Sequence, residues 1–167
     1  MPFKKRNIFI IILTILGMIN AFYLSYLAYE LVFAAKDGFL AVSPCDINDT
    51  FSCSNALKSP RVHIFGIPFP MIAAVVYPVL FVLSLVAYFR NSVNMIKIIT
   101  IMAFGGLCFN GYIMYQEYLM QVFCPLCLMC TGYILTIGLT GLSILRENRL
   151  FQVVFIAMNT WQEKNNK

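Results

Sequence analysis

Four long apolar runs dominate this chain and constrain what it can fold into. The hydrocarbon core of a bilayer is about 30 Å thick, and an α-helix crosses it in about 20 residues. Four segments reach that length with few polar interruptions: residues 8–29, 67–89, 96–119 and 124–145. A soluble domain carries about 25% charged residues, whereas this chain carries 11% and is 60% hydrophobic. The sequence predicts an all-α integral membrane protein, with a four-transmembrane-helix bundle in residues 1–149.

The two ends of the chain carry further features. Lys4, Lys5 and Arg6 precede an apolar run, as in a signal peptide, but the run continues to Phe33 without a small-x-small cleavage site. We therefore expect the first run to remain as an uncleaved span. Residues 150–161 are apolar but too short to span. Residues 150–167 are therefore expected to form a cytoplasmic tail that contains an interfacial helix.

The basic residues are distributed unevenly between the two sides of the predicted bundle. If the N-terminus is cytoplasmic, most of the 12 lysines and arginines fall on the cytoplasmic side: Lys4, Lys5, Arg6, Arg90, Lys97, Arg146, Arg149, Lys164 and Lys167. The positive-inside rule then predicts cytoplasmic termini and an extracytoplasmic connection over residues 34–66. The same loops account for the net charge of +5, so nucleic acid is not an expected partner.

Cys124 and Cys127 form a Cys-x-x-Cys pair where the fourth run begins. Residues at i and i+3 of a helix are neighbours on one face, and the positive end of the helix dipole favours a thiolate at Cys124. Cys127 is expected one turn deeper, nearer the lipid. Such a dithiol is suited to react with a protein thiol from the aqueous side and with a lipid-soluble oxidant from the membrane side. The chain lacks the βαβ pattern of a thioredoxin fold.

A zinc site is the alternative use of these thiols. Zinc usually requires two such pairs or a pair with histidine, and the only histidine here is His63. An oxidising compartment also favours disulfides over zinc thiolates. We therefore expect no metal.

The loop over residues 34–66 holds a second pair, Cys45 and Cys53. Taken alone, this pair is typical of a structural disulfide. Two pairs facing the same compartment are also what a relay by thiol–disulfide exchange requires. We expect Cys108 and Cys130 to pack as small apolar side chains. His63, Glu30 and Glu117 are candidate proton carriers, and ordinary interfacial polar residues are the alternative.

The combined pattern resembles the vitamin K epoxide reductase family, and in particular bacterial members that oxidise thiols for disulfide-bond formation. The resemblance covers about residues 8–145. It rests on Cys-Asp-x6-Cys-Ser from Cys45 to Ser54, on Ser59-Pro60, on Phe65-Gly66-Ile67-Pro68, and on the Cys-x-x-Cys that opens the fourth span.

The resemblance implies a bundle around a quinone, capped by the extracytoplasmic loop and its half-helix. Cys124 and Cys127 would reduce the quinone, which could be ubiquinone, menaquinone or a vitamin K-type quinone. Cys45 and Cys53 would exchange with a thioredoxin-like thiol oxidase, and Cys53 would bridge transiently to Cys124. The family pattern also implies quinone contacts for three residues: Leu57, Phe65 and Thr131. A bacterial cytoplasmic (inner) membrane is the implied location.

Two departures from the vertebrate pattern favour quinone reduction over epoxide reduction. Thr131 stands where vertebrate members carry a tyrosine, and Phe69-Pro70-Met71 replaces their polar stretch. The chain stops at Lys167 without a thioredoxin-like domain, so the partner is expected to be a separate protein. The alternatives are an epoxide reductase of the endoplasmic reticulum and a tetraspan scaffold with a structural loop disulfide. A transporter is disfavoured because the spans lack a deep charge.

Overall fold

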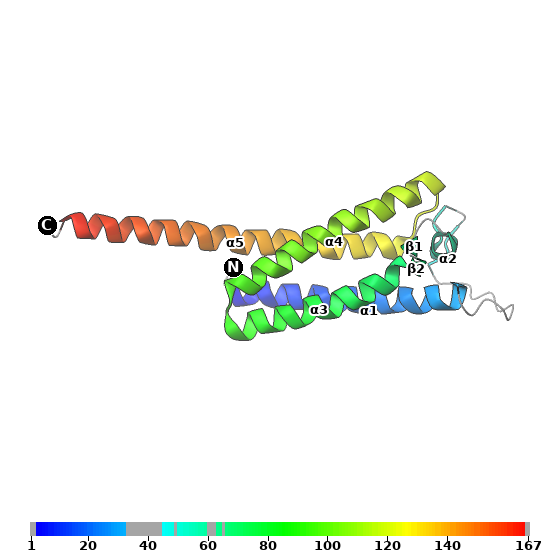
Figure 1. Cartoon of the computed structure of the whole chain (residues 1–167), viewed down its shortest axis with the longest axis horizontal. Coiled ribbons are helices and arrows are strands. Elements are labelled where there is room, and N and C mark those ends of the chain that lie inside the picture. The colour runs from blue at the N-terminus through cyan, green and yellow to red at the C-terminus, as the bar shows by residue number, and fades with distance from the viewer. Residues whose placement is uncertain (1–2, 33–44, 49, 60–62, 65, 166–167) are drawn as a thin grey trace.

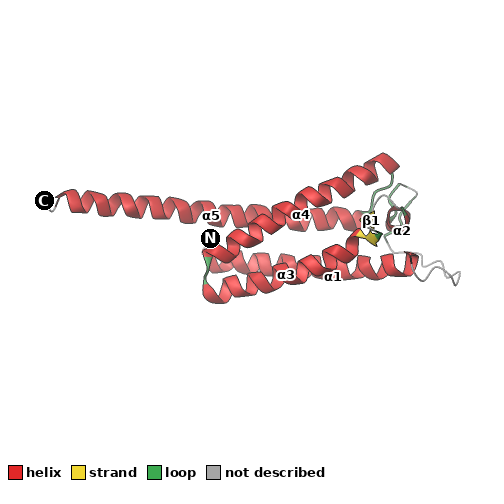
Figure 2. Ribbon diagram, in the orientation of Figure 1, coloured by secondary structure: helices red, strands yellow, loops and turns green. Residues whose placement is uncertain are grey.

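Four long helices make up most of the structure, a computed structural model that describes residues 3–32, 45–48, 50–59, 63–64 and 66–165. The long helices are α1 (Phe3–Val32), α3 (Phe69–Arg90), α4 (Val93–Met120) and α5 (Pro125–Asn165). One short helix, α2 (Cys53–Lys58), and two short strands, β1 (His63–Ile64) and β2 (Ile67–Pro68), lie at one end of the bundle. Figure 2 shows that helices account for nearly all of the described chain.

Each long helix contains a segment long and apolar enough to cross a membrane. These segments are Lys4–Leu31, Phe69–Arg90, Val93–Met120 and Pro125–Arg149. Large apolar side chains such as Phe22, Val75 and Phe89 are exposed on the outside of the bundle, where a soluble protein would carry charges. The all-α, four-span prediction is therefore confirmed.

The helix boundaries differ from the expected ones at two places. The second long helix begins at Phe69 instead of residue 67, because Ile67 and Pro68 pair in an antiparallel ladder with Ile64 and His63. The turn between these strands contains Gly66, whose φ of 81° is easily adopted by glycine. The β-hairpin therefore leads directly into α3.

The fourth long helix does not end near Arg149. It continues as one helix from Pro125 to Asn165 and extends well past the other helices at the end that carries the N-terminus (Figure 1). The tail that we expected as a separate interfacial helix is thus a continuation of α5 in the structure. Residues 166–167 lie outside the described residues.

The bundle interior is closely packed between neighbouring helices. A single apolar cluster contains Ile10 of α1, Leu80 of α3, Ile99 of α4 and Ile137 of α5. Gly17 of α1 is buried and faces the ring of Tyr77, so this crossing depends on a residue without a side chain. The cluster packs the four long helices against one another.

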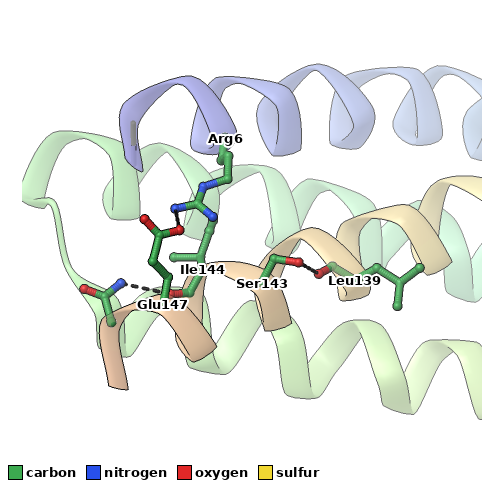
Figure 3. Close-up of polar contacts among 6 residues, drawn as sticks. Arg6, Leu139, Ser143, Ile144 and Glu147 are labelled. Carbon is green, nitrogen blue, oxygen red and sulfur yellow. Dashed lines mark hydrogen bonds and ion pairs between the residues drawn. The ribbon is translucent and has the colours of Figure 1, made fainter. Parts of the chain in front are cut away.

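The end of the bundle opposite the β-hairpin carries an ion pair between Arg6 of α1 and Glu147 of α5 (Figure 3). Other polar side chains of α5 here bond to the preceding turn: Ser143 donates to the carbonyl of Leu139 at 2.9 Å. These contacts are at the opposite end from α2.

Candidate redox site

The loop that carries Cys53 is joined to the chain just before Cys124. Phe51 and Phe123 form a parallel β-bridge, in which Ser52 N donates to Phe123 O at 3.1 Å and Phe123 N donates to Thr50 O at 2.7 Å. The rings of Phe51 and Phe123 also lie 6.1 Å apart, centroid to centroid. The bridge brings together two segments that are far apart in sequence. Cys53, two residues after Phe51, and Cys124, directly after Phe123, are therefore brought close together.

Asp46 fixes the position of α2 within this loop. Its carboxylate accepts hydrogen bonds from Ser52 Oγ at 2.8 Å, Ser54 N at 3.0 Å and Ser54 Oγ at 2.6 Å. Ser52 is also the N-cap of α2, and its Oγ accepts from Asn55 N at 3.2 Å. A carboxylate near a helix N-terminus is favoured by the helix dipole. Asp46 thus anchors the turn from which Cys53 projects.

The four cysteines singled out in the sequence lie together under α2. Cys45 and Cys53 form a disulfide, whereas Cys124 and Cys127 are free thiols. The Sγ of Cys124 lies 3.1 Å from the Sγ of Cys53. All four side chains are at most 8% exposed, and they share one apolar cluster with Leu24, Leu27 and Ala28 of α1 and Ala56 and Leu57 of α2. Exchange between the two pairs therefore needs little movement, and the apolar cluster shields it from water.

Glu117 of α4 is buried beside these sulfurs, with a side chain that is only 1% exposed. Its Oε2 accepts a hydrogen bond from the backbone N–H of Cys124 at 3.2 Å. A Glu117 carboxylate oxygen and the Sγ atoms of Cys124 and Cys127 all lie within 4.8 Å of one another. The thiols of Cys124 and Cys127 therefore have a carboxyl as a direct neighbour.

The two remaining cysteines differ in their surroundings. Cys108 is exposed on α4, facing the outside of the bundle, so the expectation that it packs inside the core is wrong. Cys130 is buried in α5, where its Sγ accepts a hydrogen bond from Asn20 Nδ2 at 3.2 Å and its carbonyl accepts one from Tyr77 Oη at 3.1 Å. Cys130 thus contributes to the contacts of α5 with α1 and α3.

A pocket lies between α3, α4 and α5, deeper in the bundle than Cys127. Its lining is mostly apolar: Phe69, Ile72, Ala73, Val76, Tyr77, Gly106, Phe109, Asn110, Cys130 and Ile134. Asn110 is 3% exposed, and its Oδ1 has no hydrogen-bond partner. Its Nδ2 donates to Thr131 Oγ1 at 2.7 Å, and Thr131 Oγ1 donates to the carbonyl of Cys127 at 2.9 Å. A chain of hydrogen bonds therefore connects the pocket to Cys127.

The residues that the family pattern suggested for a quinone pocket fall in different places. Leu57 is buried against the four cysteines and is not part of this pocket lining. Thr131 is outside the pocket lining but accepts a hydrogen bond from Asn110, which is part of that lining. Phe65 lies outside the described residues. Of the three candidate proton carriers, His63 bonds to the carbonyl of Ser59 at 2.8 Å, and only Glu117 is grouped with cysteine sulfurs.

Replacing Asp46 with alanine should slow exchange between the two cysteine pairs by about tenfold or more. Each hydrogen bond to a charged group contributes about 1.5–3 kcal/mol, and about 1.4 kcal/mol corresponds to a factor of ten. The substitution removes the acceptor of three hydrogen bonds that hold the start of α2. The measurement is the rate of disulfide transfer from the loop pair, followed by alkylation and mass spectrometry. Asp46→Asn keeps one acceptor oxygen, so its rate of disulfide transfer should lie between those of the wild type and Asp46→Ala. A wild-type rate for Asp46→Ala would contradict this assignment.

One family model matches most of the chain. The model of the Vitamin K epoxide reductase family matches residues 8–144, which contain α2 to α4, most of α1, most of the spanning part of α5 and all six cysteines. No curated protein matches the chain.

Proposed function

The chain belongs to the vitamin K epoxide reductase family, and we propose that this membrane thiol oxidoreductase reoxidises a thioredoxin-like partner. The electrons taken from the partner pass to a membrane quinone. The partner would be a separate protein with a reduced dithiol. The observation that carries the proposal is the 3.1 Å separation between Cys124 Sγ and Cys53 Sγ, the latter bonded to Cys45. At this separation a sulfur of one pair is in contact with a sulfur of the other, as exchange requires.

The relay proceeds by successive exchanges between neighbouring sulfurs. The partner dithiol reduces the Cys45–Cys53 disulfide and is itself oxidised to a disulfide. The Cys53 thiolate then attacks Cys124 of an oxidised Cys124–Cys127 pair, which forms a Cys53–Cys124 bond and releases the Cys127 thiolate. Attack of Cys45 on Cys53 restores the loop disulfide and leaves Cys124 and Cys127 reduced. The described arrangement, with an oxidised loop pair and a reduced membrane pair, corresponds to the end of this sequence.

We assign the ring of the quinone to the pocket between α3, α4 and α5. Its walls are apolar and aromatic, and the unpaired Oδ1 of Asn110 supplies an acceptor for a quinol hydroxyl. Rotation of the Asn110 amide would present Nδ2 to a quinone carbonyl and turn Oδ1 toward Thr131. A quinone bound here would accept two electrons and two protons and become a quinol. Asn110 would orient it, and the aromatic walls would exclude water.

We place the protein in the cytoplasmic membrane of a bacterium. The basic residues near the ends of the spans support cytoplasmic termini, because Arg6 and Arg90 lie at the bundle end opposite α2. The cysteine cluster would then face the extracytoplasmic side, where disulfides persist. A soluble partner could reach the loop pair from that side.

The direct test combines the purified protein, a reduced thioredoxin-like protein and a quinone. We expect the quinone absorbance to fall in proportion to the partner disulfide formed, with ubiquinone and menaquinone analogues compared in parallel. In the same assay, Asn110→Leu should raise the KM for the quinone by about tenfold, since it removes a buried hydrogen-bond partner. Cys108→Ala serves as the control. Absence of quinone reduction by the wild-type chain with intact cysteines would reject the proposed function.

A further inference from the structure

Glu117 is a buried carboxyl that takes no part in the exchange steps of the proposed relay. It lies on the last turn of α4, and the chain then turns through Gln121, whose φ is 56°, before α5 begins. This turn folds the Glu117 side chain back onto Cys124, whose N–H it accepts at 3.2 Å. No basic side chain among the described residues is ion-paired with Glu117; the ion pair found among them joins Arg6 and Glu147 at the opposite end of the bundle. The burial of this carboxyl therefore needs an explanation other than a salt bridge.

The exchange between the two pairs creates a need for a proton donor at this place. When Cys53 attacks Cys124, the sulfur of Cys127 leaves as a thiolate. Cys127 is 3% exposed and lies in an apolar cluster, where an unpaired negative charge is costly. Among the described histidine, cysteine, aspartate and glutamate side chains, Glu117 is the carboxyl grouped with both sulfurs, within 4.8 Å. A small side-chain rotation or one bridging water closes such a distance.

We propose that Glu117 is the catalytic acid and base of the Cys124–Cys127 pair. In the transfer from the loop, Cys53 thiolate and the Cys124–Cys127 disulfide give the Cys53–Cys124 disulfide and Cys127 thiolate. Protonated Glu117 then gives its proton to that thiolate, which leaves Cys127 as a thiol and Glu117 as a carboxylate. In the reverse direction the carboxylate takes the same proton and generates the attacking thiolate. The ionisable groups that face Glu117 in this step are the thiols of Cys124 and Cys127, with Cys53 of α2 in contact with Cys124.

A purely structural role for Glu117 is the competing explanation, because its carboxylate also holds the N–H of Cys124. Glu117→Gln separates the two roles. The glutamine keeps an acceptor oxygen for the N–H of Cys124 but cannot exchange a proton with Cys127. Glu117→Asp keeps the ionisable group on a side chain that is shorter by one methylene. Glu117→Gln therefore removes proton exchange and keeps the acceptor for the backbone N–H. Glu117→Asp keeps the ionisable group and changes its distance from the backbone.

The test follows one round of electron transfer in quinone-free protein, and it rests on the relay in the proposed function. Protein with both disulfides formed is mixed with a reduced thioredoxin-like protein, quenched with acid at intervals, and alkylated for mass spectrometry. For Glu117→Gln we expect normal reduction of the Cys45–Cys53 pair and about 100-fold slower reduction of the Cys124–Cys127 pair. Glu117→Asp should recover part of the rate. Glu147→Gln, the same change at the opposite end of the bundle, should match the wild type.

The outcomes separate this inference from the function on which it rests. A Glu117→Gln chain that transfers electrons within twofold of the wild-type rate would overturn the role of Glu117 while leaving the relay intact. Equal losses for Glu117→Gln and Glu117→Asp would also overturn it, since geometry rather than proton exchange would then be limiting. If the wild-type pair Cys124–Cys127 stays oxidised after the loop pair is reduced, the relay itself fails. Quinone reduction does not enter any of these measurements.

Discussion

Replacing Cys127 with alanine should abolish quinone reduction and accumulate a disulfide between Cys53 and Cys124. Without Cys127, the membrane pair cannot form its own disulfide, so no route to the quinone remains. The Cys124 thiolate, 3.1 Å from Cys53 Sγ, can still attack the loop disulfide and release Cys45. We expect a loss of activity of about 1,000-fold or more, in the range found when a covalent catalytic group is removed. Activity is measured by quinone absorbance, and the bridge by mass spectrometry of peptides under non-reducing conditions.

A matched substitution distinguishes this trapping from a general effect of losing a cysteine. Cys108→Ala removes an exposed thiol of α4 and should retain activity without any new bridge. If the Cys127→Ala chain instead linked Cys45 to Cys124, the order of the relay would have to be reversed. Retention of quinone reduction by the Cys127→Ala chain would remove the membrane pair from the reaction.

The second large effect is expected from Gly17, where α1 crosses α3. A Cβ added here would overlap the ring of Tyr77, which is 3% exposed and held by a hydrogen bond to the carbonyl of Cys130. Because the ring is buried and hydrogen-bonded, the added Cβ forces either the ring to shift or the helices to separate. We expect Gly17→Ala to lower the free energy of unfolding by about 1–3 kcal/mol, the usual cost of overpacking a core. Thermal unfolding in detergent, followed by circular dichroism, measures the change.

Gly105 provides the control for this substitution because its Cβ would meet nothing within 4 Å. Alanine is favoured over glycine inside a helix by about 1 kcal/mol. Gly105→Ala should therefore leave the free energy of unfolding unchanged or raise it, opposite in sign to Gly17→Ala. Equal effects at the two positions would show that helix propensity, and not the contact with Tyr77, governs the result.

The spans and the two cysteine pairs could be identified from the sequence because they depend on local patterns. Apolar length is sufficient to predict a helix that crosses a bilayer. The spacing of Cys124 and Cys127 places them on one helix face whatever the rest of the chain does. The continuation of α5 past Arg149 is not predicted, since residues 150–161 are apolar but too short to span and indicate an interfacial helix in a cytoplasmic tail.

The remaining features of the site depend on contacts between distant segments. The bridge between Phe51 and Phe123 joins two short irregular stretches with no pattern that marks them as partners. Glu117 was one of three candidates in the sequence, and only the reversed turn at Gln121 sets it apart. Asn110 is not singled out in the sequence, because its importance comes from Thr131 on another helix and from an unpaired oxygen. A buried polar residue within a span was the available signal for Asn110.

The position of Cys53 between Cys45 and Cys124 imposes an order in time on the proposed relay. A sulfur atom can form only one disulfide bond, so the Cys45–Cys53 and Cys53–Cys124 bonds are mutually exclusive. While Cys53 is joined to Cys124, the loop disulfide is absent and a second reduced partner has no Cys45–Cys53 disulfide to reduce. The protein therefore alternates between a state open to its partner and a state closed to it. At saturating quinone, the lifetime of the closed state sets an upper limit on how many partner molecules one chain can oxidise per second.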